Sequence, residues 1–143
     1  MVGMAAALAL QLAVWGANPV SYTAALQDAQ KQQRPLLVLV GASWCPGCQT
    51  MKTRVIPSLA KRGGLKGVSF ANVDADAEVE TAKQLMRGSS IPQLIAFSRM
   101  PDGQWHREQL TGEVSEAEVQ TLIARAIKAQ QSKGETSAGA IGN

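Results

Sequence analysis

The chain has 143 residues, which suits one domain, and 45% of them are apolar, so a hydrophobic core is possible and a wholly disordered chain is excluded. Two cysteines are too few for a disulfide-stapled scaffold, and with one histidine they cannot complete a four-ligand zinc site. The net charge is +3, and residues 29–73 carry only basic charges. Because no aromatic residues are interleaved with them, we expect a solvated surface and no nucleic-acid partner.

The N-terminal segment is apolar over residues 1–17 apart from one glutamine, and it ends in the small residues Gly16 and Ala17. This pattern is typical of an export signal, although no Lys or Arg precedes Lys31 to give the usual basic start. We expect residues 1–18 to be a signal peptide, with a packed N-terminal helix or a short membrane anchor as alternatives. Export would place the protein in the periplasm or outside the cell, while a cytoplasmic location stays open. No apolar run predicts a stable membrane span.

The predicted domain covers residues 19–129, and its first half contains a buried strand followed by a helix that carries the two cysteines. Helical spacing predicts a helix over 21–33. The apolar run over 36–40 predicts a strand buried on both faces. The next helix should begin at Cys45–Pro46, because proline suits a first helical turn, and Pro57 should kink or end it.

The second half of the domain predicts alternating elements and a strong final helix. In chain order we expect a strand over 68–73, a helix over 77–86, strands over 93–98 and 105–111 joined by a turn, and a C-terminal helix. Ser115 and Glu118 form a capping box at the start of that helix. Residues 130–143, rich in Gly, Ser, Ala and Gln, should be a flexible tail. The order predicts an α/β fold with a mixed four-stranded sheet and helices on both faces.

The residues that carry chemistry are Cys45 and Cys48. Two intervening residues in a first helical turn bring the two sulfurs within bonding reach. The free N–H groups and partial positive charge of the helix N-terminus face the first sulfur, which lowers the pKa of the Cys45 thiol. We therefore expect Cys45 to form a mixed disulfide with a client. Cys48, one turn further in and more buried, then attacks Cys45 and releases the product.

Other interpretations of the cysteine pair stay open. Two inert core thiols are one, although the polar Ser43 and the turn residues Pro46 and Gly47 favour exposure. A soft two-sulfur site for copper or another metal is a second, with His106 as the one histidine. A c-type haem attachment needs histidine where Gln49 stands, so no cofactor is expected.

Three separate stretches together resemble the thioredoxin superfamily over about residues 20–128. They are Val-Leu-Val-Gly-Ala-Ser-Trp-Cys-x-x-Cys, Asn72-Val73-Asp74 at the end of one strand, and Ile91-Pro92 at the start of another. The stretch from Cys48 to Pro57 is similar to exported thioredoxin-like domains, including the C-terminal domain of the bacterial transmembrane disulfide reductase.

The resemblance implies a thioredoxin-like fold, with a short extra N-terminal strand as an option. It implies a cis peptide bond before Pro92 that faces the cysteines, where an ordinary trans proline is the alternative. The backbone of Ile91 would then pair with an extended client in the manner of a strand. Trp44 would shield the disulfide, while Pro46 and Gly47 would contact the client and tune the redox potential.

The sequence departs from the classical thioredoxin pattern around the second cysteine. Leu39 stands where classical thioredoxins carry a buried aspartate, and Phe70 stands where they carry a lysine. Gln93 replaces the common threonine after the cis-proline. Because a buried carboxylate can accept the proton of the second cysteine, its absence suggests that water or another group does so here.

We therefore expect an exported, monomeric thiol–disulfide oxidoreductase that exchanges a Cys45–Cys48 disulfide with protein thiols and disulfides. It should act first as a reductant, and second as an oxidant or isomerase, with an unidentified redox partner to reset the pair. A copper-handling thiol protein and a non-catalytic thioredoxin-fold binding module are the alternatives from other classes.

Overall fold

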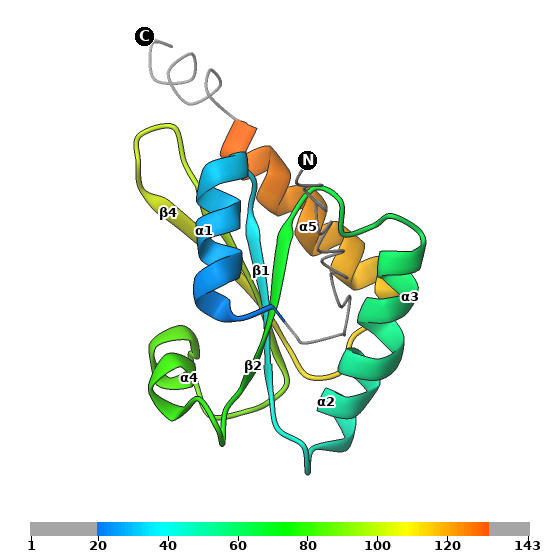
Figure 1. Cartoon of the computed structure of the whole chain (residues 1–143). Helices are drawn as coiled ribbons and strands as arrows, with labels where there is room; N and C mark the ends of the chain where they lie inside the picture. The colour runs from blue at the N-terminus through cyan, green and yellow to red at the C-terminus, as the bar shows by residue number, and fades with distance from the viewer. Residues whose placement is uncertain (1–19, 132–143) are drawn as a thin grey trace, which may run out of the picture.

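The computed structural model describes residues 20–131 (Figure 1). The predicted signal peptide at residues 1–18 lies outside the described residues, and so does nearly all of the tail predicted at 130–143. Both therefore stay predictions. None of the helices within residues 20–131 is long and apolar enough to cross a membrane.

Four strands form one mixed sheet in the order β2-β1-β3-β4. Their bounds are β1 (Leu36–Gly41), β2 (Ser69–Asp74), β3 (Gln93–Arg99) and β4 (Trp105–Thr111). The central strand β1 pairs in parallel with β2 and antiparallel with β3, and β3 forms the predicted hairpin with β4. The mixed four-stranded sheet is confirmed. No fifth strand occurs within residues 20–131, so an extra N-terminal strand would have to lie before them.

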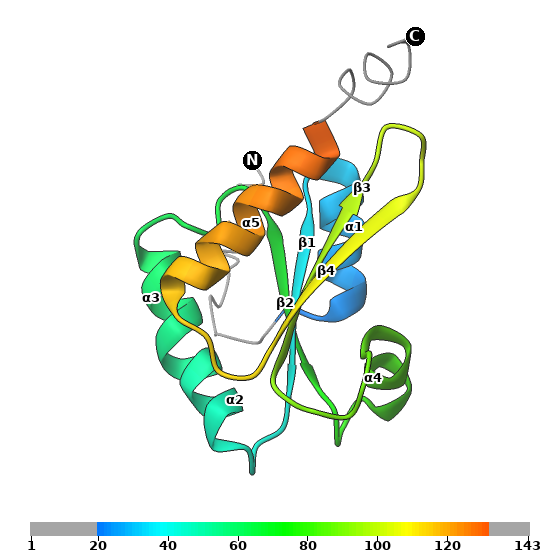
Figure 2. The same ribbon diagram turned by 180° about the vertical axis from the view of Figure 1, so that it is seen from behind.

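Helices cover both faces of this sheet, as predicted (Figures 1 and 2). They are α1 (Tyr22–Gln32), α2 (Pro46–Thr50), the π-helical turn η1 (Met51–Val55), α3 (Ile56–Lys61), α4 (Val79–Leu85) and α5 (Glu116–Gln131). On one face, Leu37 and Leu39 of β1 join the core under α3 and α5. On the other face, Val38 and Val40 join the core under α1 and α4. Strand β1 is thus buried on both faces because both sets of its alternating side chains are apolar.

The helix predicted to kink or end at Pro57 instead contains a π-helical turn just before the proline. The chain remains helical from Pro46 to Lys61, but the Ile56 N–H donates to the carbonyl of Met51, five residues back. Pro57 lies in the first turn of α3 and has no N–H to donate. The wide turn before it lets the helical segment continue past the proline.

The last helix begins as predicted. The Ser115 hydroxyl accepts from the Glu118 N–H at 3.2 Å, and the Glu118 carboxylate accepts from the Ser115 N–H at 2.8 Å. The backbone N–H of Ser115 and then its hydroxyl, which both donate to the Glu118 carboxylate, hold the pKa of Glu118 below its ordinary value. The capping box therefore fixes the start of α5 directly after the hairpin.

Candidate functional site

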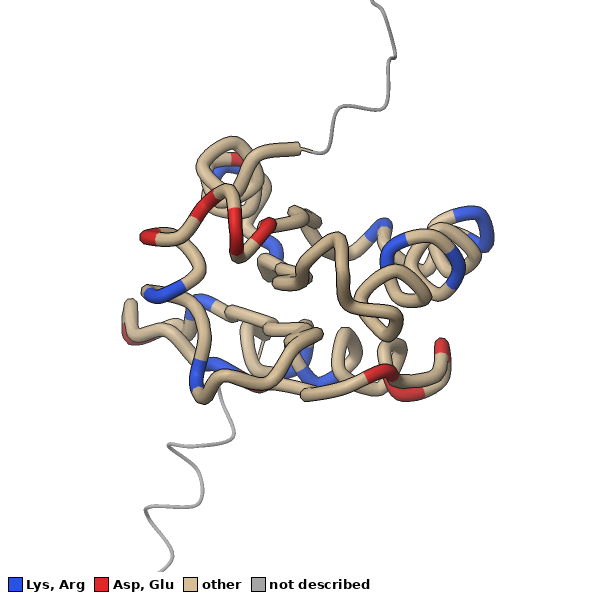
Figure 3. Tube along the Cα trace, turned by 90° about the horizontal axis from the view of Figure 1, so that it is seen from below, with Lys and Arg blue, Asp and Glu red and all other residues tan. Residues whose placement is uncertain are grey.

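A disulfide joins Cys45 and Cys48 at the end of the molecule where β1 leads into α2 (Figure 1). The Cα atoms of the two cysteines are 5.2 Å apart, within the usual range for disulfides. Acidic and basic residues are both present around this end of the molecule, which Figure 3 shows from below. The predicted pair is therefore brought together at the predicted junction.

Cys45 is the N-cap residue of α2. Its extended backbone leads from the loop into the helix, and its Sγ accepts the backbone N–H of Cys48 at 3.2 Å. This N–H belongs to the first helical turn and has no partner within the helix. The predicted contact between the helix N-terminus and the first sulfur is thus present, and it favours negative charge on that sulfur when the disulfide opens.

Both cysteines are covered, with 7% of Cys45 and 4% of Cys48 exposed. The expectation that polar neighbours would leave Cys45 well exposed is wrong, because the loop before β3 lies over it. The carbonyl oxygen of Ile91 is 3.9 Å from the Cys45 Sγ. Only a small part of Cys45 is accessible, and it lies beside this loop.

The Ile91–Pro92 peptide bond is cis, as predicted. A Cβ placed on Gly47 would lie 3.5 Å from Pro92 Cδ, so the first turn of α2 packs closely against the proline. The exposed Glu113 reaches the same place, since its Cβ would lie 3.6 Å from that added atom. Gly47 and Pro92, two of the residues predicted to contact a client, therefore lie against each other, and Glu113 lies beside them.

Trp44 directly precedes Cys45, and its predicted shielding of the disulfide stays a prediction. Trp44 is 69% exposed, and its indole N–H donates to the carboxylate of Asp76 at 2.8 Å. The hydrogen bond holds the ring toward the β2–α4 loop, at the rim of the site. The indole is therefore held at the surface, and Asp76 is a positioning partner that sequence reasoning missed.

Gln93 is the first residue of β3, directly after the cis-proline, and none of its surface is exposed. Its amide nitrogen donates to the carbonyls of Arg87, Gly88 and Ser90, and its amide oxygen accepts the Arg87 N–H. Four hydrogen bonds thus fix the loop that carries Ile91 and Pro92. The replacement of threonine by glutamine was visible in the sequence, but this function of it was not.

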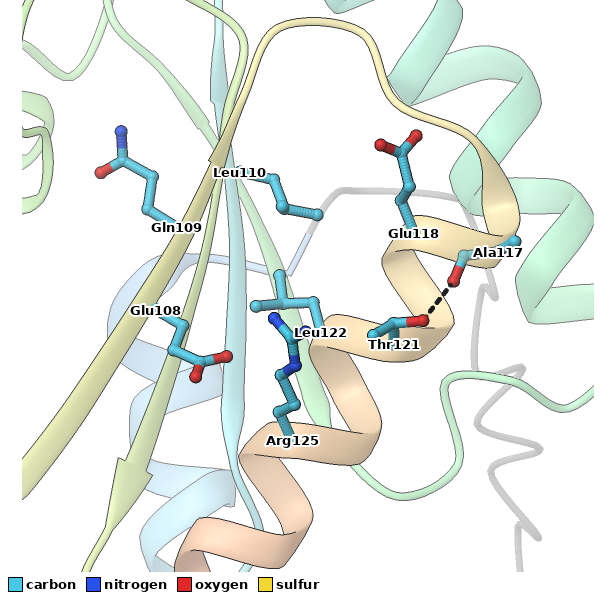
Figure 4. A pocket seen from close by; sticks show the side chains of 8 residues that line it. All are labelled: Glu108, Gln109, Leu110, Ala117, Glu118, Thr121, Leu122 and Arg125. Carbon is cyan, nitrogen blue, oxygen red and sulfur yellow. Dashed lines mark hydrogen bonds between the residues drawn. The ribbon is translucent and has the colours of Figure 1, made fainter.

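Two further features concern other places where a ligand could bind. The described residues hold no group of three His, Cys, Asp or Glu side chains that could bind a metal ion. A hollow of about 510 Å³ lies between β4 and α5. On the side of the hollow formed by α5, the Thr121 hydroxyl donates to the Ala117 carbonyl (Figure 4). This hollow contains none of the predicted site residues.

The sequence around this site is similar to that of a known protein family. A protein-family model described as thioredoxin-like matches residues 17–98, which include both cysteines and the cis-proline. The chain belongs to the thioredoxin-like family. No match was found among curated proteins.

Solved thioredoxins share the fold of this thioredoxin-like chain. One from Thermus thermophilus is 24% identical, with a TM-score of 0.65, over 86% of this chain and 94% of that one. A mutant thioredoxin from Halobacterium salinarum is 25% identical, with a TM-score of 0.58, over 76% and 88%. One from Fasciola hepatica is 22% identical, with a TM-score of 0.58, over 76% and 96%. These similarities confirm the thioredoxin-like α/β fold.

Proposed function

We propose that the protein is an exported thiol–disulfide oxidoreductase that transfers electrons to disulfides of client proteins. The observation that carries the proposal is the Cys45–Cys48 disulfide at a helix N-terminus, with its first sulfur beside the carbonyl that precedes a cis-proline. A pair placed in this way has a nucleophilic sulfur, a resolving sulfur and a backbone edge for the client.

The exchange proceeds in two balanced steps. In the reduced protein, the Cys45 thiolate attacks one sulfur of a client disulfide, forms a mixed disulfide and releases the other client sulfur as a thiolate. The Cys48 thiolate then attacks the Cys45 sulfur, which breaks the mixed disulfide and releases the second client thiolate. The client gains two electrons, and the Cys45–Cys48 pair is oxidised. A separate thiol-bearing redox partner has to reduce it again.

Client contact is expected along the surface that surrounds the first sulfur. An extended client segment would pair with the backbone of Ile91, while Trp44, Pro46, Gly47 and Pro92 would contact its side chains. Strand-like pairing through the main chain accepts many sequences, which suits an enzyme with several clients.

The mechanism is tested by trapping. A Cys48→Ser variant should accumulate mixed disulfides with client proteins through Cys45, because the resolving thiol is missing. Cys45→Ser, the matched control, should trap none and should lose turnover completely. The adducts are counted by non-reducing electrophoresis and mass spectrometry. If Cys45→Ser retains full activity, the protein is a binding module and the proposal is wrong.

The reduction potential of the pair decides the direction of electron flow. A value near about −270 mV, measured by equilibration against glutathione or dithiothreitol, is expected for a reductant. A value near about −120 mV would make the protein an oxidant of client thiols instead. The redox proposal would be overturned if Cys45 and Cys48 formed no disulfide at any potential and instead kept bound copper in the presence of a competing chelator.

Export rests on the apolar composition of residues 1–17. Expression in a bacterial host should give a periplasmic protein whose mature chain begins near Asn18. N-terminal sequencing checks this, and an uncleaved cytoplasmic product would contradict it.

A further inference from the structure

The second sulfur borders a cavity whose walls come from several elements. Cys48 faces Gly41 closely, since a Cβ placed on Gly41 would lie 2.9 Å from the Cβ and 3.0 Å from the Sγ of Cys48. The missing side chain leaves this side of Cys48 without a covering group. A cavity of about 210 Å³ lies here, lined by Cys48 and Gly41 together with Leu39, Lys52, Asp74 and Glu78.

This cavity is large enough for water. A water molecule needs a space of only about 10–15 Å³ for its centre and two or more polar partners. Charged side chains from η1, β2 and the start of α4 supply such partners. The cavity therefore gives the buried Cys48 a route to ionisable groups that is separate from the client surface.

The residues of the cavity wall differ in whether they can accept a proton from Cys48. Leu39, on the core side, can accept none. Lys52 carries a positive charge, which favours a thiolate on a neighbouring sulfur. The Asp74 Oδ1 accepts the backbone N–H groups of Asp76 and Ala77, so this carboxylate holds the β2–α4 turn, and Asp74 is more exposed than Glu78.

Glu78 is the remaining carboxylate of the wall. It is half-buried at the N-cap of α4, and its Oε2 accepts the Asp74 N–H at 3.0 Å. That bond holds the side chain at the cavity and engages one of its two oxygens. A carboxylate in this position can receive a proton through water in the cavity.

We propose that Glu78 accepts the proton of Cys48 through water in this cavity, in place of the buried carboxylate that Leu39 replaces. During resolution of the mixed disulfide, the Cys48 proton passes to water and from there to Glu78, while the thiolate attacks Cys45 and the client thiolate leaves. In the reverse direction Glu78 returns the proton to Cys48. The inference rests on the proposed oxidoreductase function, since it concerns one step of that reaction.

The test separates the resolving step from the attacking step. The reduced protein is mixed with a disulfide-bearing peptide in a series of buffers between pH 5 and 9. Samples are quenched with acid at successive times, and mass spectrometry measures the amounts of mixed disulfide and of product. Glu78→Gln keeps an oxygen that can accept the Asp74 N–H, so the fold of the turn is retained. Glu80→Gln, an exposed glutamate two residues further along the chain, is the matched control.

In Glu78→Gln, the resolving rate at pH 6 should fall roughly 10–100-fold, at or below the lower end of general acid–base effects. The deficit should shrink as the pH rises, because hydroxide then takes over as the proton acceptor. The rate of attack by Cys45 should not change. Glu80→Gln should match the wild type in both steps.

Two outcomes overturn the inference. One is a resolving step in Glu78→Gln with the wild-type rate and pH profile. The other is an equal loss in Glu80→Gln, which would indicate a general effect of surface charge. In both cases the wild type still resolves its mixed disulfide, so the proposed function stands. A wild type that forms no mixed disulfide overturns both proposals.

A rescue experiment gives a second readout. Leu39→Asp in the Glu78→Gln background places a carboxylate on the core side of the same cavity. Where this double variant folds, as judged by circular dichroism, its resolving rate at pH 6 should recover most of the loss. A folded double variant as slow as Glu78→Gln would contradict a proton route through the cavity.

Discussion

Gln93 shows how one side chain can hold a reactive surface without touching it. Its amide reaches backward along the chain and binds four backbone groups of residues 87–90, which precede the cis-proline. A threonine at this position is too short to span that distance. The loop over Cys45 is therefore fixed from inside the sheet, and Ile91 and Pro92 are held in place with it.

We predict that Gln93→Leu destabilises both the fold and client binding. Leucine has a similar size but removes the four hydrogen bonds of the Gln93 amide, and of the groups it leaves only the Arg87 carbonyl keeps another side-chain donor, Gln109, so the free energy of unfolding should fall by about 2 kcal/mol. The KM for a client peptide should rise, while the reduction potential of the cysteine pair should stay the same. Urea denaturation and steady-state kinetics measure these effects.

The control for this change is Gln104→Leu, in the exposed turn between β3 and β4. It should alter the unfolding free energy by no more than about 0.5 kcal/mol. An equally small effect of Gln93→Leu would show that the loop is held by other contacts.

At the level of elements, one charged cluster ties α1 to β2. Asp28 of α1 accepts from the guanidinium of Arg34 at 2.6 Å and from the hydroxyl of Ser69 at 2.5 Å. Arg34 also donates to the Ser69 hydroxyl at 3.0 Å. The hydrogen bond from Ser69, followed by that from Arg34, holds the pKa of Asp28 below its ordinary value of 3.8.

This pKa shift predicts how stability depends on pH. A carboxyl group with a lowered pKa stabilises the folded state above its ordinary pKa, and the effect is lost as the pH falls through the lower, folded value. Asp28→Asn should therefore lower the urea midpoint at pH 7, and the difference from the wild type should fade below pH 3.8.

Urea titrations of both proteins between pH 2 and 7 check this behaviour. Glu80→Gln again serves as a control, since its exposed ion pair with Lys83 should contribute little. A difference between Asp28→Asn and the wild type that stays constant down to pH 2 would show that the ionised carboxylate is not its source.

For the whole molecule, the sequence was informative wherever neighbouring residues decide the structure. The apolar run of β1, the capping box of α5 and the cysteine spacing each depend on a few consecutive residues, and the structure confirms all three. The cis bond before Pro92 was inferred from family resemblance and is confirmed as well.

Contacts between distant segments could not be predicted in this way. Asp76 binds the indole of Trp44 across 32 residues, and Glu78 reaches the cavity beside Cys48 only because β2 pairs with β1. A row of acids after a strand gives no sign of which carboxylate will face which partner. That assignment needs the strand order and register, which arise from packing of the entire sheet.

The central place of β1 determines how long the site keeps its shape. Strand β1 is paired on both edges and buried on both faces. The amide protons of such a strand exchange with solvent only when the whole domain unfolds. Cys45 follows β1 after a loop of three residues, and the Ala75 N–H donates to the carbonyl of Gly41 at its end. Local unfolding of peripheral helices thus leaves the position of Cys45 unchanged. We expect Cys45 to keep this position for as long as the whole domain stays folded.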